Sequence, residues 1–196
     1  MNLLRTFIIA AFASSVIAVS AQEHLKSLDP SGFDDQGRQF DSQGNMVNWW
    51  TDEDAAEFKK LTEGLVDQYS AVEVLPGLYA NGRYTLGENI ADQGGLRIAM
   101  TAFLDSQKKK GVDVKSEEAK IDGFDPMQVF YLNFANVWAN NIRDEEIRSL
   151  TIGDVHSLAK NRVNVAIRNL DTFFTTFGIT DGDDMFRPQS ERVVIW

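Results

Sequence analysis

The chain has 196 residues, a formal net charge of −10, no cysteine and only two histidines, His24 and His156. The acidic balance disfavours nucleic acid and anionic membrane surfaces as partners, and the lack of cysteine excludes disulfides, thiol nucleophiles and thiolate metal sites. A catalytic zinc site built without cysteine needs three ligands from His, Asp or Glu, so the supply of histidine limits the metal chemistry. Length and composition are those of one globular domain.

The first 21 residues have the pattern of a secretory signal peptide. Arg5 precedes an apolar run, 7–19, which is short for a membrane span, and Val19-Ser20-Ala21 is a small-residue cleavage site. We therefore expect an exported protein, periplasmic or extracellular, with no stable membrane span after cleavage; an uncleaved anchor is the alternative. Residues 22–31 form a short polar leader, and 32–196 are expected to form one domain.

Four segments have helical periodicity, and one has the alternation of a strand. Caps and apolar spacing predict helices at 52–70, after Thr51, and at 86–106, 126–143 and 170–177, the last capped by Asn169. In the third, Phe130, Phe134, Val137 and Trp138 form the expected buried stripe. Helix 86–106 is apolar on more than one side and should be central. Val163, Val165 and Ile167 alternate with less apolar residues, which favours a strand. The expected fold is mainly α, with at most one or two short strands.

Two carboxylates, Glu88 and Asp92, lie four residues apart at the start of helix 86–106. This spacing places them on one helix face, where they repel unless another group uses them, and a divalent cation is one candidate. The alternative is a capping box in Thr85-Leu86-Gly87-Glu88, where Glu88 only caps the helix; spacing alone favours this interpretation.

The whole stretch Gly87-Glu88-Asn89-Ile90-Ala91-Asp92-Gln93-Gly94-Gly95 resembles a motif of the neprilysin and endothelin-converting-enzyme family of zinc metallopeptidases. The resemblance covers about Gly32 to Trp196 and includes Asp154-Val155-His156 and Arg162. It implies the C-terminal helical portion of a thermolysin-like catalytic domain, which cleaves peptide or protein substrates with zinc-activated water. By the same resemblance Glu88 is a zinc ligand, Asp92 holds a zinc-bound histidine, His156 stabilises the oxyanion and Arg162 holds a substrate carbonyl. We expect His156 and Arg162 to approach the face of Glu88 and Asp92, and Arg162 to neutralise part of the acidic charge.

The resemblance fails just before Gly32-Phe33-Asp34-Asp35, where the family has H-E-x-x-H. Residues 27–31 here read Ser-Leu-Asp-Pro-Ser, so both zinc histidines and the general-base glutamate are missing. We therefore expect no stoichiometric zinc and no activity of this chain alone. One hypothesis is the C-terminal part of a peptidase, internally deleted, with a complementing peptidase fragment as a candidate partner. The other is a secreted non-catalytic module that binds a peptide or a partner.

Overall fold

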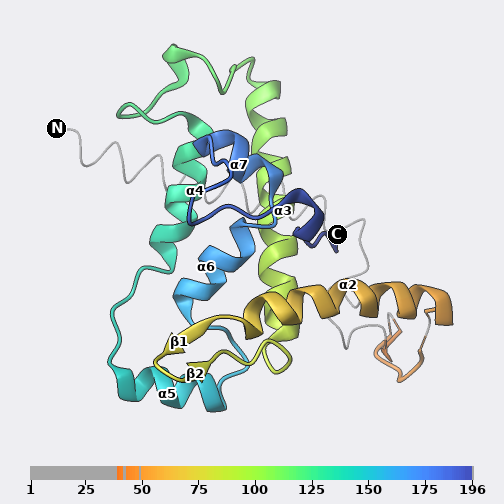
Figure 1. Ribbon diagram of the computed structural model, residues 1–196. Coiled ribbons are helices and arrows are strands. Elements are labelled where there is room, and N and C mark those ends of the chain that lie inside the picture. Colours follow the sequence, from red (N-terminus) through yellow and green to blue (C-terminus); the bar gives the residue numbers. More distant parts are fainter. Residues whose placement is uncertain (1–38, 42, 49, 196) are drawn as a thin grey trace.

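The computed structural model describes residues 39–41, 43–48 and 50–195. The expected signal peptide, the leader and residues 27–31 lie outside the described residues. In the part described, six α-helices and one two-stranded hairpin form the fold, which confirms the expected mainly α class (Figure 1). No helix in this part combines the length and apolar character needed to cross a membrane.

Helix α2 (Asp52–Ser70) matches its predicted bounds and begins with a side-chain cap. The Asp54 backbone N–H donates to Thr51 Oγ1 at 3.1 Å, which satisfies a donor that the helix leaves unpaired. Phe58, Leu65 and Tyr69 form its buried side. The helix crosses the N-terminal half of α3 in Figure 1.

The strands occur in a different place from the one predicted. β1 (Glu73–Leu75) and β2 (Leu78–Tyr79) pair antiparallel around Gly77, whose φ of +76° lies in the left-handed region that favours glycine.

Helix α3 (Leu86–Lys109) is the central element and runs three residues beyond the predicted end. One hydrophobic cluster packs against α2, and a second packs against the C-terminal helices. Ile90 belongs to the first, while Leu96 and Met100 belong to the second. The central position expected for this helix is confirmed, because α3 is buried against elements on two sides.

Helix α4 (Pro126–Val137) starts as predicted but ends six residues early. Asp125 and Gln128 form a reciprocal capping box at its start. The predicted buried stripe is wrong at Val137, which is 74% exposed. Tyr131, on the neighbouring face, is instead the buried aromatic residue, at 3% exposed. A short 3₁₀ turn, η3 (Glu117–Ala119), precedes this helix.

The C-terminal third contains three helices, two of them unexpected. α5 (Asp144–Gly153) was not predicted, and α6 (Ala159–Ile167) occupies the segment predicted as a strand. α7 (Asp171–Phe177) matches its prediction, but its N-cap is Leu170, so the expected cap at Asn169 is wrong. Asn169 is instead a buried hydrogen-bonding centre, as described below. The 3₁₀ turn η4 (Gln189–Glu191) lies in the last segment.

Candidate functional site

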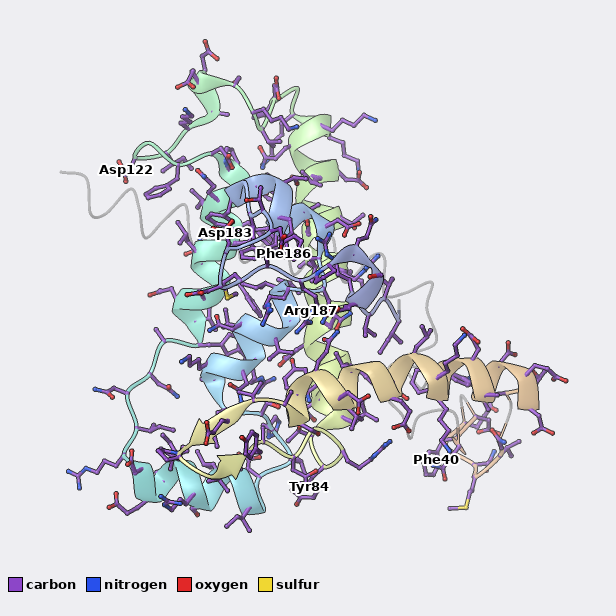
Figure 2. The ribbon with its side chains drawn as sticks, viewed as in Figure 1. Phe40, Tyr84, Asp122, Asp183, Phe186 and Arg187 are labelled. Carbon is purple, nitrogen blue, oxygen red and sulfur yellow. The ribbon has the colours of Figure 1, made fainter. Side chains whose placement is uncertain are left out.

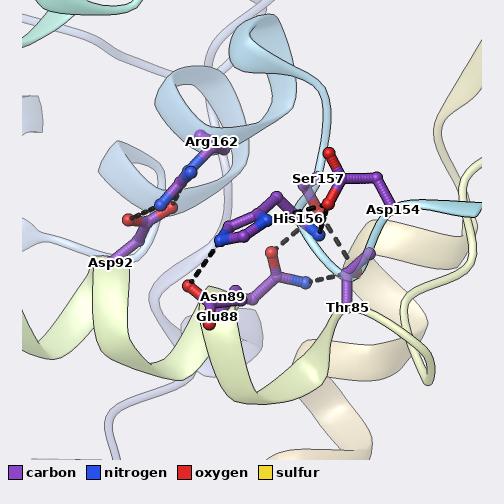
Figure 3. Close-up of polar contacts among 8 residues, drawn as sticks. All are labelled: Thr85, Glu88, Asn89, Asp92, Asp154, His156, Ser157 and Arg162. Atoms are coloured by element: carbon purple, nitrogen blue, oxygen red, sulfur yellow. Dashed lines mark hydrogen bonds and ion pairs between the residues drawn. The ribbon is translucent and has the colours of Figure 1, made fainter. Parts of the chain in front are cut away.

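Glu88 and Asp92 project from the first turns of α3, toward the loop before α6 and toward α6 itself (Figure 3). Thr85 is the residue before the helix, but its side chain makes no capping hydrogen bond. Its hydroxyl donates instead to the Asn81 carbonyl oxygen at 3.1 Å. The capping-box interpretation is therefore wrong, and the Glu88 carboxylate is available for another contact.

Arg162 and Asp92 form a two-point ion pair between α6 and α3. Arg162 Nε and Nη2 donate to the two Asp92 oxygens at 2.6 and 2.7 Å. The side chains are only 14% and 11% exposed, and the guanidinium lies 3.9 Å from the centre of the Trp138 ring. Hydrogen bonding to Asp92 raises the pKa of Arg162 above its ordinary value. The pair fixes Arg162 rigidly, since a guanidinium fork matches a carboxylate in geometry and charge.

His156 lies between two carboxylates, as Figure 3 shows. Its Nδ1 is 2.8 Å from Asp154 Oδ1 and its Nε2 is 3.2 Å from Glu88 Oε2. The His156 backbone N–H also donates to Asp154 Oδ1, and this bond, followed by the ring contact, lowers the pKa of Asp154. Asp154 thus orients the imidazole so that Nε2 points at Glu88.

A buried polar trio holds this loop against the start of α3. Ser157 Oγ donates to Asn89 Oδ1 at 2.7 Å, and Asn89 Nδ2 donates to Thr85 Oγ1 at 2.9 Å. All three side chains are buried. Sequence reasoning considered Thr85 only as part of a helix cap and did not select Asn89 or Ser157, although these two directly follow Glu88 and His156. They act on the site only by fixing where the neighbouring side chains lie.

The four residues implied by the resemblance are thus brought together on one side of α3, as predicted. Arg162 neutralises Asp92, and its pKa is also raised by the charge of Glu88. Sequence reasoning missed Asp154 and Trp138 as the neighbours that orient His156 and Arg162.

The described residues do not fit a catalytic zinc ion. Such a site needs three protein ligands, and across the described ranges no three His, Cys, Asp or Glu side chains are grouped to hold a metal. Glu88 has one histidine beside it, and both oxygens of Asp92 are occupied by Arg162.

Comparison with known proteins decides the family. The sequence pattern of peptidase family M13 matches residues 30–193. The chain belongs to peptidase family M13. The resemblance to neprilysin and endothelin-converting enzymes found in the sequence is thereby confirmed.

Relatives of this M13 chain come from insects, bacteria and mammals. An endothelin-converting enzyme homolog of Locusta migratoria is 40% identical over 155 residues, covering 78% of this chain and 20% of that protein. A neutral endopeptidase of Lactococcus lactis is 36% identical over 164 residues, covering 84% and 23%. The inhibitor complex of Mycobacterium tuberculosis zinc metalloprotease ZMP1 superposes with a TM-score of 0.77 at 38% identity, covering 85% of this chain and 25% of that one. The chain therefore spans about a fifth to a quarter of the length of these relatives.

Proposed function

We propose that this chain is the C-terminal part of an exported M13 zinc metalloendopeptidase and does not hydrolyse peptides on its own. The observation that carries the proposal is that one set of residues of the family's catalytic site is present in this chain, whereas the other set is missing. Glu88, Asp92, His156 and Arg162 form one cluster, yet the 196 residues contain no H-E-x-x-H sequence. In this proposal Glu88 is the zinc ligand and Asp92 the carboxylate for a ligand histidine in the intact enzyme.

The remaining two residues are positioned to hold a peptide. Asp154 orients His156, whose Nε2 can donate to a carbonyl oxygen or to an oxyanion once it carries a proton. Asp92 uses Nε and Nη2 of Arg162, which leaves Nη1 as a donor for a substrate carbonyl. His156 and Arg162 are thus proposed as the oxyanion donor and the substrate-binding residue.

Elemental analysis and a peptidase assay test the proposal together. The purified chain should contain well below one zinc per molecule and should not cleave a peptide substrate, because the water lacks both its metal and its base. Stoichiometric zinc with cleavage that a chelator abolishes would refute the proposal. Weak zinc binding without cleavage agrees with it, since exposed carboxylates and histidine bind metal non-specifically.

Residues 27–31, Ser-Leu-Asp-Pro-Ser, stand where the family resemblance implies H-E-x-x-H. We propose that the junction before Gly32 marks an internal deletion from a longer peptidase. Sequencing of the locus should reveal an omitted coding stretch ending in H-E-x-x-H, or a related full-length gene. Export is tested separately by finding a secreted protein that begins at Gln22. A complementing fragment carrying the missing helix should restore chelator-sensitive cleavage if the two parts assemble.

A non-catalytic binding module is the second candidate, and the Asp92–Arg162 pair favours it, because both oxygens of Asp92 accept from Arg162 and the carboxylate is thus already paired within the chain. Glu88→Gln is the sharper test, since the Glu88 side chain is 41% exposed and can be changed with little effect on folding. If the chain captures a peptide and Glu88→Gln abolishes capture at unchanged stability, the binding module becomes the better account. If the chain is unstable until a complementing fragment is added, the truncated peptidase is favoured.

A further inference from the structure

A pocket lies away from the candidate site, between the C-terminal half of α2 and the last segment of the chain. Its volume is about 530 Å³. The lining residues come from α2, from the end of α6 and from the segment around η4: Gly64, Asp67, Gln68, Ala71, Val72, Arg168, Arg187, Ser190, Glu191, Arg192 and Val193. None of the four residues assigned to the peptidase site lines it, so the two sites are separate.

Arg187 is the most unusual residue of this pocket, because its charge is buried without an acidic partner. The residue is only 7% exposed, and Figure 2 labels it near the centre of the view. Its Nη1 donates to Gln68 Oε1 at 2.5 Å and to Asn169 Oδ1 at 3.0 Å, both uncharged. Its Nε and Nη2 donate to no residue that the structure describes. Burial, and then repulsion from Arg168, lowers the pKa of Arg187 to about 10, which still leaves it charged at neutral pH.

Arg168 brings a second uncompensated guanidinium to the same pocket. Its Nη2 donates to the Phe186 carbonyl oxygen at 2.7 Å. Its Nε is buried and has no hydrogen-bond partner among the described residues. Arg192 differs, since its Nη1 donates to Asp171 Oδ1 at 2.6 Å and its guanidinium covers the Phe174 ring. Two of the three arginines therefore lack an ion-pair partner in the described part of the chain.

The pocket's own acids do not cancel this charge. Asp67 and Glu191 line it, and the charge of Glu191 partly offsets that of Arg187. Neither acid forms an ion pair with Arg168 or Arg187 among the described residues. A buried cation that lacks a close anion is strongly unfavourable, and two cations sharing one pocket repel each other. An anion bound between them would remove both penalties.

The side chains around Arg187 are held before any ligand arrives. Asn169 Oδ1 accepts from Gln68 Nε2 and from the Val193 backbone N–H, at 3.0 and 2.9 Å. Asn169 Nδ2 donates back to Gln68 Oε1 at 2.7 Å. Because these amides saturate one another, Arg187 is fixed by neutral groups, and its unused donors remain available to a ligand.

We propose that this pocket binds a small oxyanion, a phosphate or carboxylate group, between Arg168 and Arg187. Planar guanidinium forks match the oxygens of both groups, and both groups take several charge-assisted hydrogen bonds at once. The volume admits a small molecule that bears such a group. This inference does not depend on the peptidase proposal, because it uses other residues.

Inorganic phosphate and acetate are the two probes, each titrated at ionic strength held constant with sodium chloride. We expect one or both to raise the thermal unfolding midpoint saturably and to give a binding isotherm by calorimetry. Binding of phosphate alone would identify a phosphate group as the ligand chemistry, and binding of acetate alone a carboxylate. The net charge of −10 works against non-specific anion binding, which sharpens the result. If neither anion shifts the midpoint beyond the chloride control, the proposal is wrong.

Arg168→Gln is the diagnostic variant, because Arg168 is less buried than Arg187. Losing a charge-assisted hydrogen bond should weaken binding about tenfold or more. Arg168→Lys, which keeps the charge, should retain part of the affinity. Arg148→Gln, on the exposed surface of α5, is the matched control and should bind like the parent. Equal affinity in Arg168→Gln and the parent would overturn the proposal. If Arg168→Gln does not fold, the comparison of Arg168→Lys with the parent decides in its place.

Discussion

The Arg162–Asp92 pair is the strongest side-chain interaction in the candidate site, and its loss should be costly. Arg162→Ala leaves the Asp92 carboxylate mostly buried without its cation, so we expect the free energy of unfolding to fall by about 3 kcal/mol. Arg162→Lys should recover only part of this, because an ammonium cannot reproduce the two-point contact. Urea unfolding measures both variants. A loss no larger than that of the exposed-residue control Arg148→Ala would show that the pair contributes little.

Asp154 should make stability depend on pH in the acid range. Hydrogen bonds from the His156 backbone N–H and ring lower its pKa in the fold below the ordinary value of 3.8. The unfolded chain therefore binds the proton more readily than the native chain does. The contribution is fully present above pH 3.8 and is lost as the pH falls through the lowered folded pKa. NMR titration of the Asp154 carboxyl checks the direction; a midpoint at or above 3.8 would contradict it.

Tyr69 and Tyr131 are both buried, but the loss of their hydroxyl groups should affect the free energy of unfolding differently. The Tyr69 hydroxyl has no hydrogen-bond partner among the described residues, and burial raises its pKa. Tyr69→Phe should therefore change the free energy of unfolding by less than about 0.5 kcal/mol, or increase it. The Tyr131 hydroxyl lies 2.6 Å from Thr172 Oγ1, so Tyr131→Phe should cost about 1 kcal/mol. Equal losses in denaturant unfolding would mean that Tyr69 has a partner too.

At the scale of elements, Gly82 sets how closely the turn before α3 approaches α2. A Cβ at this position would lie 2.3 Å from the Val66 carbonyl oxygen, a backbone atom that cannot move aside easily. We expect Gly82→Ala to destabilise the fold by about 1–3 kcal/mol and to disturb the start of α3. Gly95→Ala is the control, because a Cβ there meets nothing within 4 Å, and it should stabilise α3 by about 0.5–1 kcal/mol. Thermal unfolding compares the two; equal effects would contradict the clash.

The capped helices could be predicted from sequence, whereas α6 could not, for a packing reason. Val163 and Ile167 pack in the cluster with α4 and α7, while Val165 packs in the cluster with α2. The helix is therefore buried on two sides, which produces the apolar alternation of a strand. α5 was missed because it is short and its apolar side is small: Ile147 and Leu150 lie three residues apart on one face but are only half-buried, and the helix fully buries no residue. Its three acids in the first turn were the available signal.

The candidate site could be predicted only as far as the motifs extend. The spacing of Glu88 and Asp92 predicted only that they share a helix face. The family resemblance selected them for the site, together with His156 and Arg162, and the structure brings all four together. The contacts of Ser157 with Asn89 join residues 68 positions apart. Such pairs depend on the packing of the loop onto α3, which local patterns do not encode.

At the scale of the whole molecule, stability should be distributed very unevenly. α3 contributes buried side chains to both hydrophobic clusters: Leu86, Ile90, Leu96 and Met100. α5 contributes none, and its Ile152 is 75% exposed. Local opening costs least where few apolar contacts must be broken. α5 should therefore open without unfolding the rest of the chain.

Hydrogen exchange followed by mass spectrometry tests this distribution. Amides of 144–153 should exchange first among the helices, and those of the middle of α3 last, near the rate set by global unfolding. The loop that carries His156 directly follows α5, but Ser157 holds that loop to Asn89 through a buried hydrogen bond. Protection should therefore rise sharply between α5 and α6. Ser157→Ala, which removes the donor, should extend the fast exchange through the His156 loop while α3 stays protected. Slow exchange of α5, at a rate that rises as the protein is diluted, would contradict the expectation and show that another copy covers this helix.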